Sequence, residues 1–258
     1  MPRFAANLTM LFTEAAMLSR PRHAVNAGFD GVEVLFPYDH TPKEWAAALE
    51  GIPVALINAP PGDWAAGDRG HAAVPGAEKA FRASFLKAAD LATRLAAARV
   101  HIMAGIARGP VAEQTYLDNL AWAAAQAPDL ALCIEPLNPV DMPGYFLNDF
   151  DQAGRLIDDL ALTHLGMQFD LWHASRLHGD ADAVWEKHKH RVNHVQISGL
   201  VNRNEPGGGG FDLTGLCSDL DTIGYTGWLA AEYRPAKGTV QGLAWLGALK
   251  GRAQMMGS

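Results

Sequence analysis

Four polar residues stand at the ends of four successive apolar segments, where apolar side chains are expected. They are Glu135 in LCIEPLN, Asp170 in MQFDLWH, Gln196 in HVQISG and Glu232 in LAAEYRP. If each segment is a strand, each side chain enters a buried interior, where an ionised carboxylate is costly unless a charge or a metal compensates it. Three carboxylates and one amide oxygen form a hard ligand set that suits Mg²⁺ or Mn²⁺. Each residue alone could be a hydrogen-bonded strand end, but the four together predict a metal site.

Short apolar segments that alternate with longer helix-period segments must position these residues. We expect strands at residues 3–8, 31–36, 53–58, 99–104, 130–135, 165–170, 192–198 and 228–233. We expect helices at residues 13–27, 41–50, 77–98, 111–127, 148–160, 180–190, 212–223 and 239–254. Eight such pairs predict an α/β fold, a single (β/α)8 TIM barrel, whose active site lies at the carboxyl ends of the strands. A doubly wound sheet is the alternative, but no Gly-x-Gly-x-x-Gly turn follows the first strand.

Local signals predict where several helices begin. Thr41 and Pro42 resemble an N-cap followed by a proline at the first helical position. Asn148 is expected to cap the helix that begins at Asp149. Because an interior proline breaks a helical hydrogen bond, Pro21 predicts that the first helix starts late or bends.

Length and composition are consistent with one barrel domain over residues 1–258. The chain has 258 residues, of which 49% are hydrophobic. Its formal charge of −7 does not favour nucleic acid, so small solutes are the expected partners. No apolar run approaches the roughly 18 to 20 residues of a membrane helix. The two cysteines cannot form a disulfide framework. These two observations together favour a cytoplasmic protein. A homo-oligomer stays open, because aromatic residues serve an interface and a helix-to-barrel layer equally well.

Motifs along nearly the whole chain identify a family. They are RFAANLTMLF, GFDGVEVLFPYD, LINAPPGDWAAGDRG, IEPLN, QFDLWH, HVQI, EPGGG and AAEYRP, of which GDWAAGDRG and IEPLN are the most specific. With them the chain resembles the hydroxypyruvate isomerase family, within the xylose-isomerase-like sugar isomerase and epimerase barrels. The resemblance implies that Glu135, Asp170, Gln196 and Glu232 hold the metal. It also implies that Glu135 and Glu232 are the catalytic acid and base.

Such a pair has a clear chemical purpose. Isomerising an α-hydroxy carbonyl needs a base at one carbon, an acid at its neighbour and a cation to stabilise the enediolate. For hydroxypyruvate, one glutamate would remove a proton from C3, and a proton returned at C2 would give tartronate semialdehyde. Which glutamate does which stays open.

Residues near the strand ends are candidates for binding this small hydroxy-oxo acid. His173, three residues beyond Asp170, is placed to polarise or protonate a substrate oxygen, or else packs in its loop. Arg203 and Glu205 follow the seventh strand. A guanidinium there could hold the substrate carboxylate bidentately, whereas a surface Arg/Glu pair is the alternative.

Four further polar or aromatic residues each have more than one interpretation. Asn58 could hydrogen-bond substrate or cap the turn that follows it. Trp64 could exclude water when its loop closes, or pack only against that loop. Glu33 could orient a neighbour, bind substrate or form a strand-end hydrogen bond. His194, two residues before Gln196, is expected to be a buried, hydrogen-bonded histidine rather than a fifth ligand.

Several competing functions share this barrel and site. The substrate could be a four-carbon relative such as a 2-oxo-tetronate, and the reaction could be epimerisation or dehydration of a sugar or inositol. Gln196 stands where many sugar epimerases carry histidine, which favours the isomerase by resemblance. A metal-dependent abasic-site endonuclease would want clustered histidines and a basic face, which the chain does not offer. A non-catalytic sugar-binding barrel would leave the glutamate pair unexplained.

Overall fold

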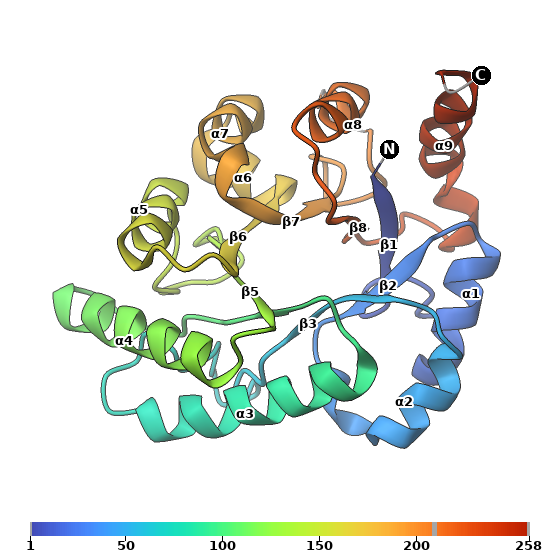
Figure 1. The fold of residues 1–258 in the computed structure, drawn as a ribbon. Helices are drawn as coiled ribbons and strands as arrows, with labels where there is room; N and C mark the ends of the chain where they lie inside the picture. The colour runs from blue at the N-terminus through green and yellow to red at the C-terminus, as the bar shows by residue number, and fades with distance from the viewer. Residues whose placement is uncertain (1, 208–210, 257–258) are drawn as a thin grey trace.

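Eight parallel strands form a closed barrel in sequence order, with helices around its outside (Figure 1). The structure, a computed structural model, describes residues 2–207 and 211–256. The strands are β1 (Arg3–Asn7), β2 (Gly31–Val34), β3 (Val54–Asn58), β4 (Arg99–His101), β5 (Ala131–Ile134), β6 (Leu165–Asp170), β7 (Val192–Ile197) and β8 (Trp228–Ala231). Strand β8 pairs with β1, which closes the barrel. The predicted TIM barrel and its eight strands are therefore confirmed, with several strands ending up to three residues early.

Nine α-helices lie within the described residues. They are α1 (Arg20–Asn26), α2 (Pro42–Leu49), α3 (Glu78–Leu95), α4 (Pro110–Gln126), α5 (Phe150–Leu160), α6 (Leu171–His178), α7 (Ala181–His188), α8 (Leu213–Thr222) and α9 (Ala244–Met256). Short 3-10 turns lie at Met17–Ser19, Pro37–Asp39, Lys189–Arg191 and Val240–Gly242. No helix in this described part of the chain combines the length and apolarity needed to span a membrane.

The helix starts follow the sequence signals in two of three cases. Thr41 forms a capping box with Glu44 at the start of α2, and α1 starts late, with Pro21 in its first turn. The prediction for Asn148 is wrong, because Asp149 is the N-cap of α5 and accepts a hydrogen bond from the backbone N–H of Gln152. An aspartate directly before the first turn satisfies the free N–H groups better than an amide one residue further out.

One helix was not expected from the sequence. Helix α6 begins directly after β6, and Asp170 is both the last residue of that strand and the N-cap, accepting from the backbone N–H of Trp172 at 2.8 Å. This cap uses Oδ1 of Asp170 and leaves Oδ2 for other contacts. The first turn of this helix consequently places His173 beside Asp170 at the end of β6.

Two antiparallel bridges tie the loops over the carboxyl ends of the strands. Gly70 pairs with Ala104, and Ile106 pairs with Tyr145. Gly70 has φ +100°, and a Cβ there would lie 2.3 Å from the carbonyl oxygen of Met103, so only glycine fits this approach. The long segment after β3 is thereby held against the segment that follows β4.

Candidate active site

A cavity of about 1400 Å³ opens at the carboxyl ends of the strands. Six of the residues expected at the site line it: Asn58, Trp64, Glu135, His173, Arg203 and Glu232. Asp170 and Gln196 are fully buried at the ends of β6 and β7, where their side chains contact these lining residues. Glu205 is not among the lining residues, and its Oε1 instead accepts from the backbone N–H of Ala236 at 2.9 Å.

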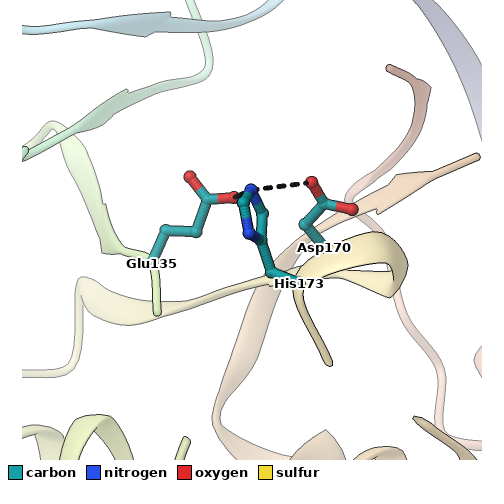
Figure 2. A group of neighbouring side chains, drawn as sticks. All are labelled: Glu135, Asp170 and His173. Atoms are coloured by element: carbon teal, nitrogen blue, oxygen red, sulfur yellow. Dashed lines mark ion pairs between the residues drawn. The ribbon is translucent and has the colours of Figure 1, made fainter. Parts of the chain in front are cut away.

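Glu135, Asp170 and His173 form a compact buried group (Figure 2). One possible ligand atom from each lies within 4.8 Å of the others. Nε2 of His173 is 3.6 Å from Oδ2 of Asp170 and 4.0 Å from Oε1 of Glu135. The three residues come from the loop after β5, the end of β6 and the first turn of α6.

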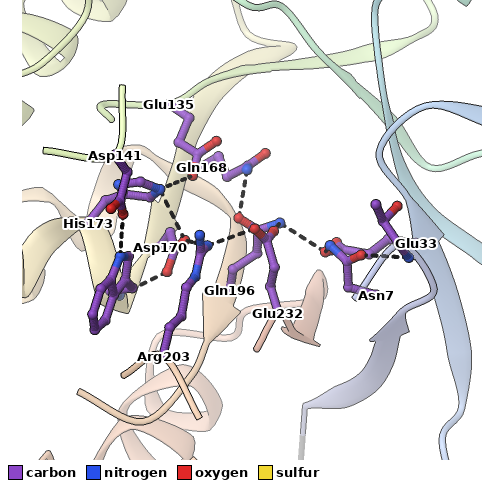
Figure 3. Close-up of polar contacts among 12 residues, drawn as sticks. Asn7, Glu33, Glu135, Asp141, Gln168, Asp170, His173, Gln196, Arg203 and Glu232 are labelled. Carbon is purple, nitrogen blue, oxygen red and sulfur yellow. Dashed lines mark hydrogen bonds and ion pairs between the residues drawn. The ribbon is translucent and has the colours of Figure 1, made fainter. Parts of the chain in front are cut away.

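Arg203 joins Asp170 to Glu232, and Gln196 in turn donates to Glu232 (Figure 3). Nη2 of Arg203 donates to Glu232 at 2.7 Å and also contacts Asp170. The side-chain amide of Gln196 donates to Glu232 and to Glu33, the latter at 2.8 Å. The guanidinium therefore compensates two of the carboxylates expected to hold the metal.

Burial raises the pKa of the four carboxyl groups of Glu33, Glu135, Asp170 and Glu232. Desolvation raises the pKa of Asp170 and of Glu232 to about 7, against the opposing attraction of Arg203. The pKa of Glu135 is raised well above its usual range by desolvation and then by the charges of Asp170 and Glu232. The pKa of Arg203 is also raised: burial lowers it, but the charges of the surrounding carboxylates together raise it by more.

Counting charges tests whether a divalent cation fits here. Four carboxylates are buried at or below the cavity floor: Glu33, Glu135, Asp170 and Glu232. The guanidinium groups beside them are those of Arg203 and of Arg99, which contacts His194. When all four are ionised, the carboxylates exceed these two cations by two charges, and without a bound cation their raised pKa values relieve this excess through protonation. The all-oxygen donor set and this imbalance together fit a divalent cation such as Mg²⁺ or Mn²⁺.

His173 is oriented by two donors that face the same ring nitrogen. The backbone N–H of Asn138 donates to Nδ1 at 3.0 Å, and the side-chain amide of Asn138 lies 2.9 Å from it. The amide orientation is fixed because its oxygen accepts from the backbone N–H groups of Val140 and Asp141. Nδ1 is thus an acceptor, so the neutral ring carries its proton on Nε2 and points that N–H at the carboxylates. Burial keeps the ring neutral by lowering its pKa well below the usual value.

A second buried network supports the site from below. Nε2 of His194 lies 2.7 Å from Oε2 of Glu33, and Arg99 lies 3.1 Å from Nδ1 of the same ring. Asn7 donates to Oε1 of Glu33 at 2.8 Å. His194 is therefore the buried, hydrogen-bonded residue that the sequence indicated. Glu33 does not line the cavity but accepts a hydrogen bond from Gln196, which also donates to Glu232.

His101 is a cavity residue that was not singled out from the sequence. It ends β4, is 1% exposed and lies with Nδ1 3.7 Å from Oε2 of Glu135. Burial lowers its pKa to about 3. Strand alternation was the available signal, since it places His101 on the same inward face as Arg99.

Trp64 both packs within its loop and lines the cavity. The guanidinium of Arg69 lies 3.7 Å from the centre of the Trp64 ring, and the Phe36 ring lies at 5.7 Å. The ring remains 41% exposed. The two interpretations of this residue are therefore compatible.

The barrel and its buried acidic site define an α/β-barrel protein with a candidate active site at the carboxyl ends of the strands, and comparison with known proteins shows its family. The profile of the family described as "Xylose isomerase-like TIM barrel" matches residues 21–249. The chain is 43% identical to the 2-oxo-tetronate isomerase of Cupriavidus necator, over 98% of this chain and 100% of that one. It is 37% identical to the hydroxypyruvate isomerase of Escherichia coli, over 95% and 98%. The chain therefore belongs to the xylose isomerase-like TIM barrel family.

A solved structure shows the same fold at high similarity. The crystal structure of a protein from Brucella melitensis, described as an AP endonuclease of family 2, superposes with a TM-score of 0.92 at 40% identity, covering 96% of this chain and 99% of that one. The curated relatives are named as isomerases, so the expected enzyme class is confirmed.

Proposed function

We propose that this enzyme moves a carbonyl group between C2 and C3 of a small hydroxy-oxo acid. The substrates are hydroxypyruvate, which would give tartronate semialdehyde, or a 2-oxo-tetronate, which would give its 3-oxo isomer. The observation that carries the proposal is the placement of two buried glutamates, Glu135 and Glu232, on either side of Asp170 at one cavity floor. The names of the relatives from Cupriavidus necator and Escherichia coli support this substrate class.

In this mechanism, one glutamate removes the C3 proton and the other protonates C2 of the resulting enediolate. Because the reaction is reversible, each glutamate serves as base in one direction and as acid in the other. Glu135, Asp170, Gln196 and Glu232 are the residues that would hold the cation. When bound, a divalent cation supplies Lewis acidity that stabilises negative charge on the substrate oxygens.

The other lining residues bind the substrate and exclude water. The Nε2–H of His173 points at the reaction centre and can donate to a substrate oxygen as charge develops there. Arg203, already beside Asp170 and Glu232, offers its guanidinium to the substrate carboxylate. Trp64 lines the cavity, where its ring would protect the enediolate from protonation by solvent.

Proton NMR in D₂O with added Mg²⁺ tests this proposal. We expect the protein to isomerise hydroxypyruvate or 2-oxo-tetronate and to incorporate deuterium at C2 and C3. Glu135→Gln and Glu232→Gln should each lower kcat by about 10²- to 10⁴-fold, the usual contribution of a general acid or base. Glu186→Gln, an exposed residue of α7, is the matched control. Wild-type protein that exchanges neither acid would refute the function.

The description of the Brucella melitensis protein raises the alternative of an abasic-site endonuclease. The chain's formal charge of −7 opposes binding to a polyanion. A titration with duplex DNA that contains an abasic site, at physiological salt, separates the two functions. Tight binding followed by strand cleavage would favour the nuclease, whereas we expect neither.

A further inference from the structure

Unpartnered polar atoms gather on the side of the cavity formed by β3 and β4. Asn58 and His101 are register partners at the ends of these neighbouring strands, and both line the cavity. Asn58 is 4% exposed and His101 is 1% exposed. Among the residues that the structure describes, Oδ1 of Asn58 and both ring nitrogens of His101 have no hydrogen-bond partner. Buried polar atoms are rarely left unpaired, so these atoms indicate a ligand.

The chemistry of these atoms matches a hydroxyl group. A neutral imidazole offers one donor and one acceptor, and the amide oxygen offers an acceptor, whereas a hydroxyl both donates and accepts. A substrate carboxylate does not fit here, because Oε2 of Glu135 lies 3.7 Å from Nδ1 of His101 and would repel it. The Asn58–His101 pair therefore suits an uncharged, hydroxylated part of the substrate.

Two of the arginines that line the cavity, Arg203 and Arg234, lie on its opposite side. Arg203 follows β7 and Arg234 follows β8, while Arg176 belongs to α6. In the closed eight-stranded barrel, β3 and β4 lie across from β7 and β8. The substrate is thereby oriented with its carboxylate toward the arginines, its reacting carbons over Glu135 and Glu232, and its far end toward Asn58 and His101.

We propose that Asn58 and His101 bind the C4 hydroxyl of a four-carbon substrate and make the enzyme select 2-oxo-tetronate over hydroxypyruvate. This inference rests on the proposed isomerase function. Hydroxypyruvate ends at C3, whose hydroxyl belongs to the reacting centre, so it has no group to place between Asn58 and His101. A site that is built to hydrogen-bond a substrate hydroxyl discriminates strongly against an analogue that lacks it.

The test compares kcat/KM for three acids: 2-oxo-tetronate, its 4-deoxy analogue 3-hydroxy-2-oxobutanoate, and hydroxypyruvate. The rate measured is solvent deuterium incorporation at C3 in the presence of Mg²⁺, because exchange reports the proton transfer whatever happens to the product. We expect wild-type protein to favour 2-oxo-tetronate over the 4-deoxy analogue by about 10- to 100-fold. His101→Leu should lose most of this preference through a higher KM for 2-oxo-tetronate, while its rate with the 4-deoxy analogue changes only a few-fold. His101→Gln, which keeps a donor and an acceptor, should retain part of it.

Met103→Leu is the matched control, because Met103 lines the same cavity with an apolar side chain. It should change the rates with the three acids by the same factor. Equal losses with 2-oxo-tetronate and its 4-deoxy analogue in His101→Leu would overturn the inference and leave the isomerase function standing. The comparison in wild-type protein keeps the inference falsifiable even if the variants fail to fold, since equal rates with those two acids overturn it. No exchange with any of the three acids would refute the proposed function and the inference with it.

Discussion

Replacing His173 separates two roles that its position allows. The ring lies within 4.8 Å of ligand atoms of Glu135 and Asp170, so distance alone makes it a candidate metal ligand. The hydrogen bonds to Nδ1 favour the other role, a donor to the substrate. We therefore expect His173→Phe to bind Mn²⁺ within a few-fold of wild-type affinity while its kcat/KM falls by about 10²- to 10³-fold, the usual effect of losing one such donor.

The contacts of Asn138 allow an estimate of the free energy that metal coordination by Nε2 of His173 would cost. To coordinate a metal through Nε2, the neutral ring would have to carry its proton on Nδ1. That proton would face the backbone N–H at 3.0 Å and the side-chain amide at 2.9 Å. Two hydrogen bonds of about 1 kcal/mol each would be lost, and the buried donors left unpaired would cost about 1–3 kcal/mol more. The total of about 3–5 kcal/mol equals about 10²- to 10⁴-fold in metal affinity.

Calorimetric titration of metal-free protein with Mn²⁺ measures the affinity, and C3 deuterium exchange with Mg²⁺ measures the activity. Asp170→Asn is the comparison, because it weakens a residue expected to be a true ligand and should cost at least about 10²-fold in affinity. The ¹⁵N chemical shifts of His173 should show an unprotonated Nδ1. The reasoning is refuted if His173→Phe loses as much Mn²⁺ affinity as Asp170→Asn.

Three further outcomes are expected from the structure. Mn²⁺ at about 100 times its Kd should raise the free energy of unfolding by about 2.7 kcal/mol, and Tm by about 5–10 °C, in a thermal melt; no shift relative to EDTA would contradict a metal site. Thr41→Ala removes the capping box of α2 and should lower the free energy of unfolding by about 1 kcal/mol in urea titrations without changing kcat; a loss of activity would contradict a purely local role. The pKa of His101 is about 3 in the fold and 6.5 as its ordinary value, so the unfolded chain binds the extra proton and the protein loses stability as the pH falls below 6.5. In EDTA, the free energy of unfolding of His101→Leu should not show this loss. Relative to wild-type protein it should rise by up to about 2.7 kcal/mol as the pH falls from 6.5 to about 4.5. Parallel plots of the free energy of unfolding against pH for the two proteins would refute this prediction.

The barrel and the positions of its carboxylates were predictable because both depend on local pattern. Short apolar segments define the strands, and a carboxylate at the end of such a segment must face the common mouth of a parallel barrel. Helix α6 was not predicted, because Asp170 had been interpreted only as a site residue, whereas it also caps the helix that follows. An aspartate at a strand end is the same observation in the sequence whether it belongs to the site, caps a helix or does both.

The pairing of buried polar groups could not be predicted in the same way. Arg203 reaches Asp170 and Glu232 only because its loop adopts positive φ angles at Asn202 and Arg203. Sequence spacing gives no indication of such a loop geometry. His101 was missed for a different reason, since one histidine in the apolar segment HIMAG resembles a core residue until strand pairing sets it beside Asn58.

The side-chain amide of Gln196 links the buried network of Glu33 and His194 to Glu232. Its nitrogen carries two hydrogens, and these are donated to Glu33 and to Glu232, while its oxygen accepts from Gln168 at 2.7 Å and keeps a second lone pair. A neutral histidine at this position would have one N–H and could satisfy only one of the two carboxylates. Glutamine at this position therefore does two things at once. Its nitrogen orients Glu232 through a hydrogen bond, and its oxygen belongs to the expected set of metal ligands. Glu33 is thus linked to Glu232 through the side-chain amide of Gln196 and does not itself line the cavity.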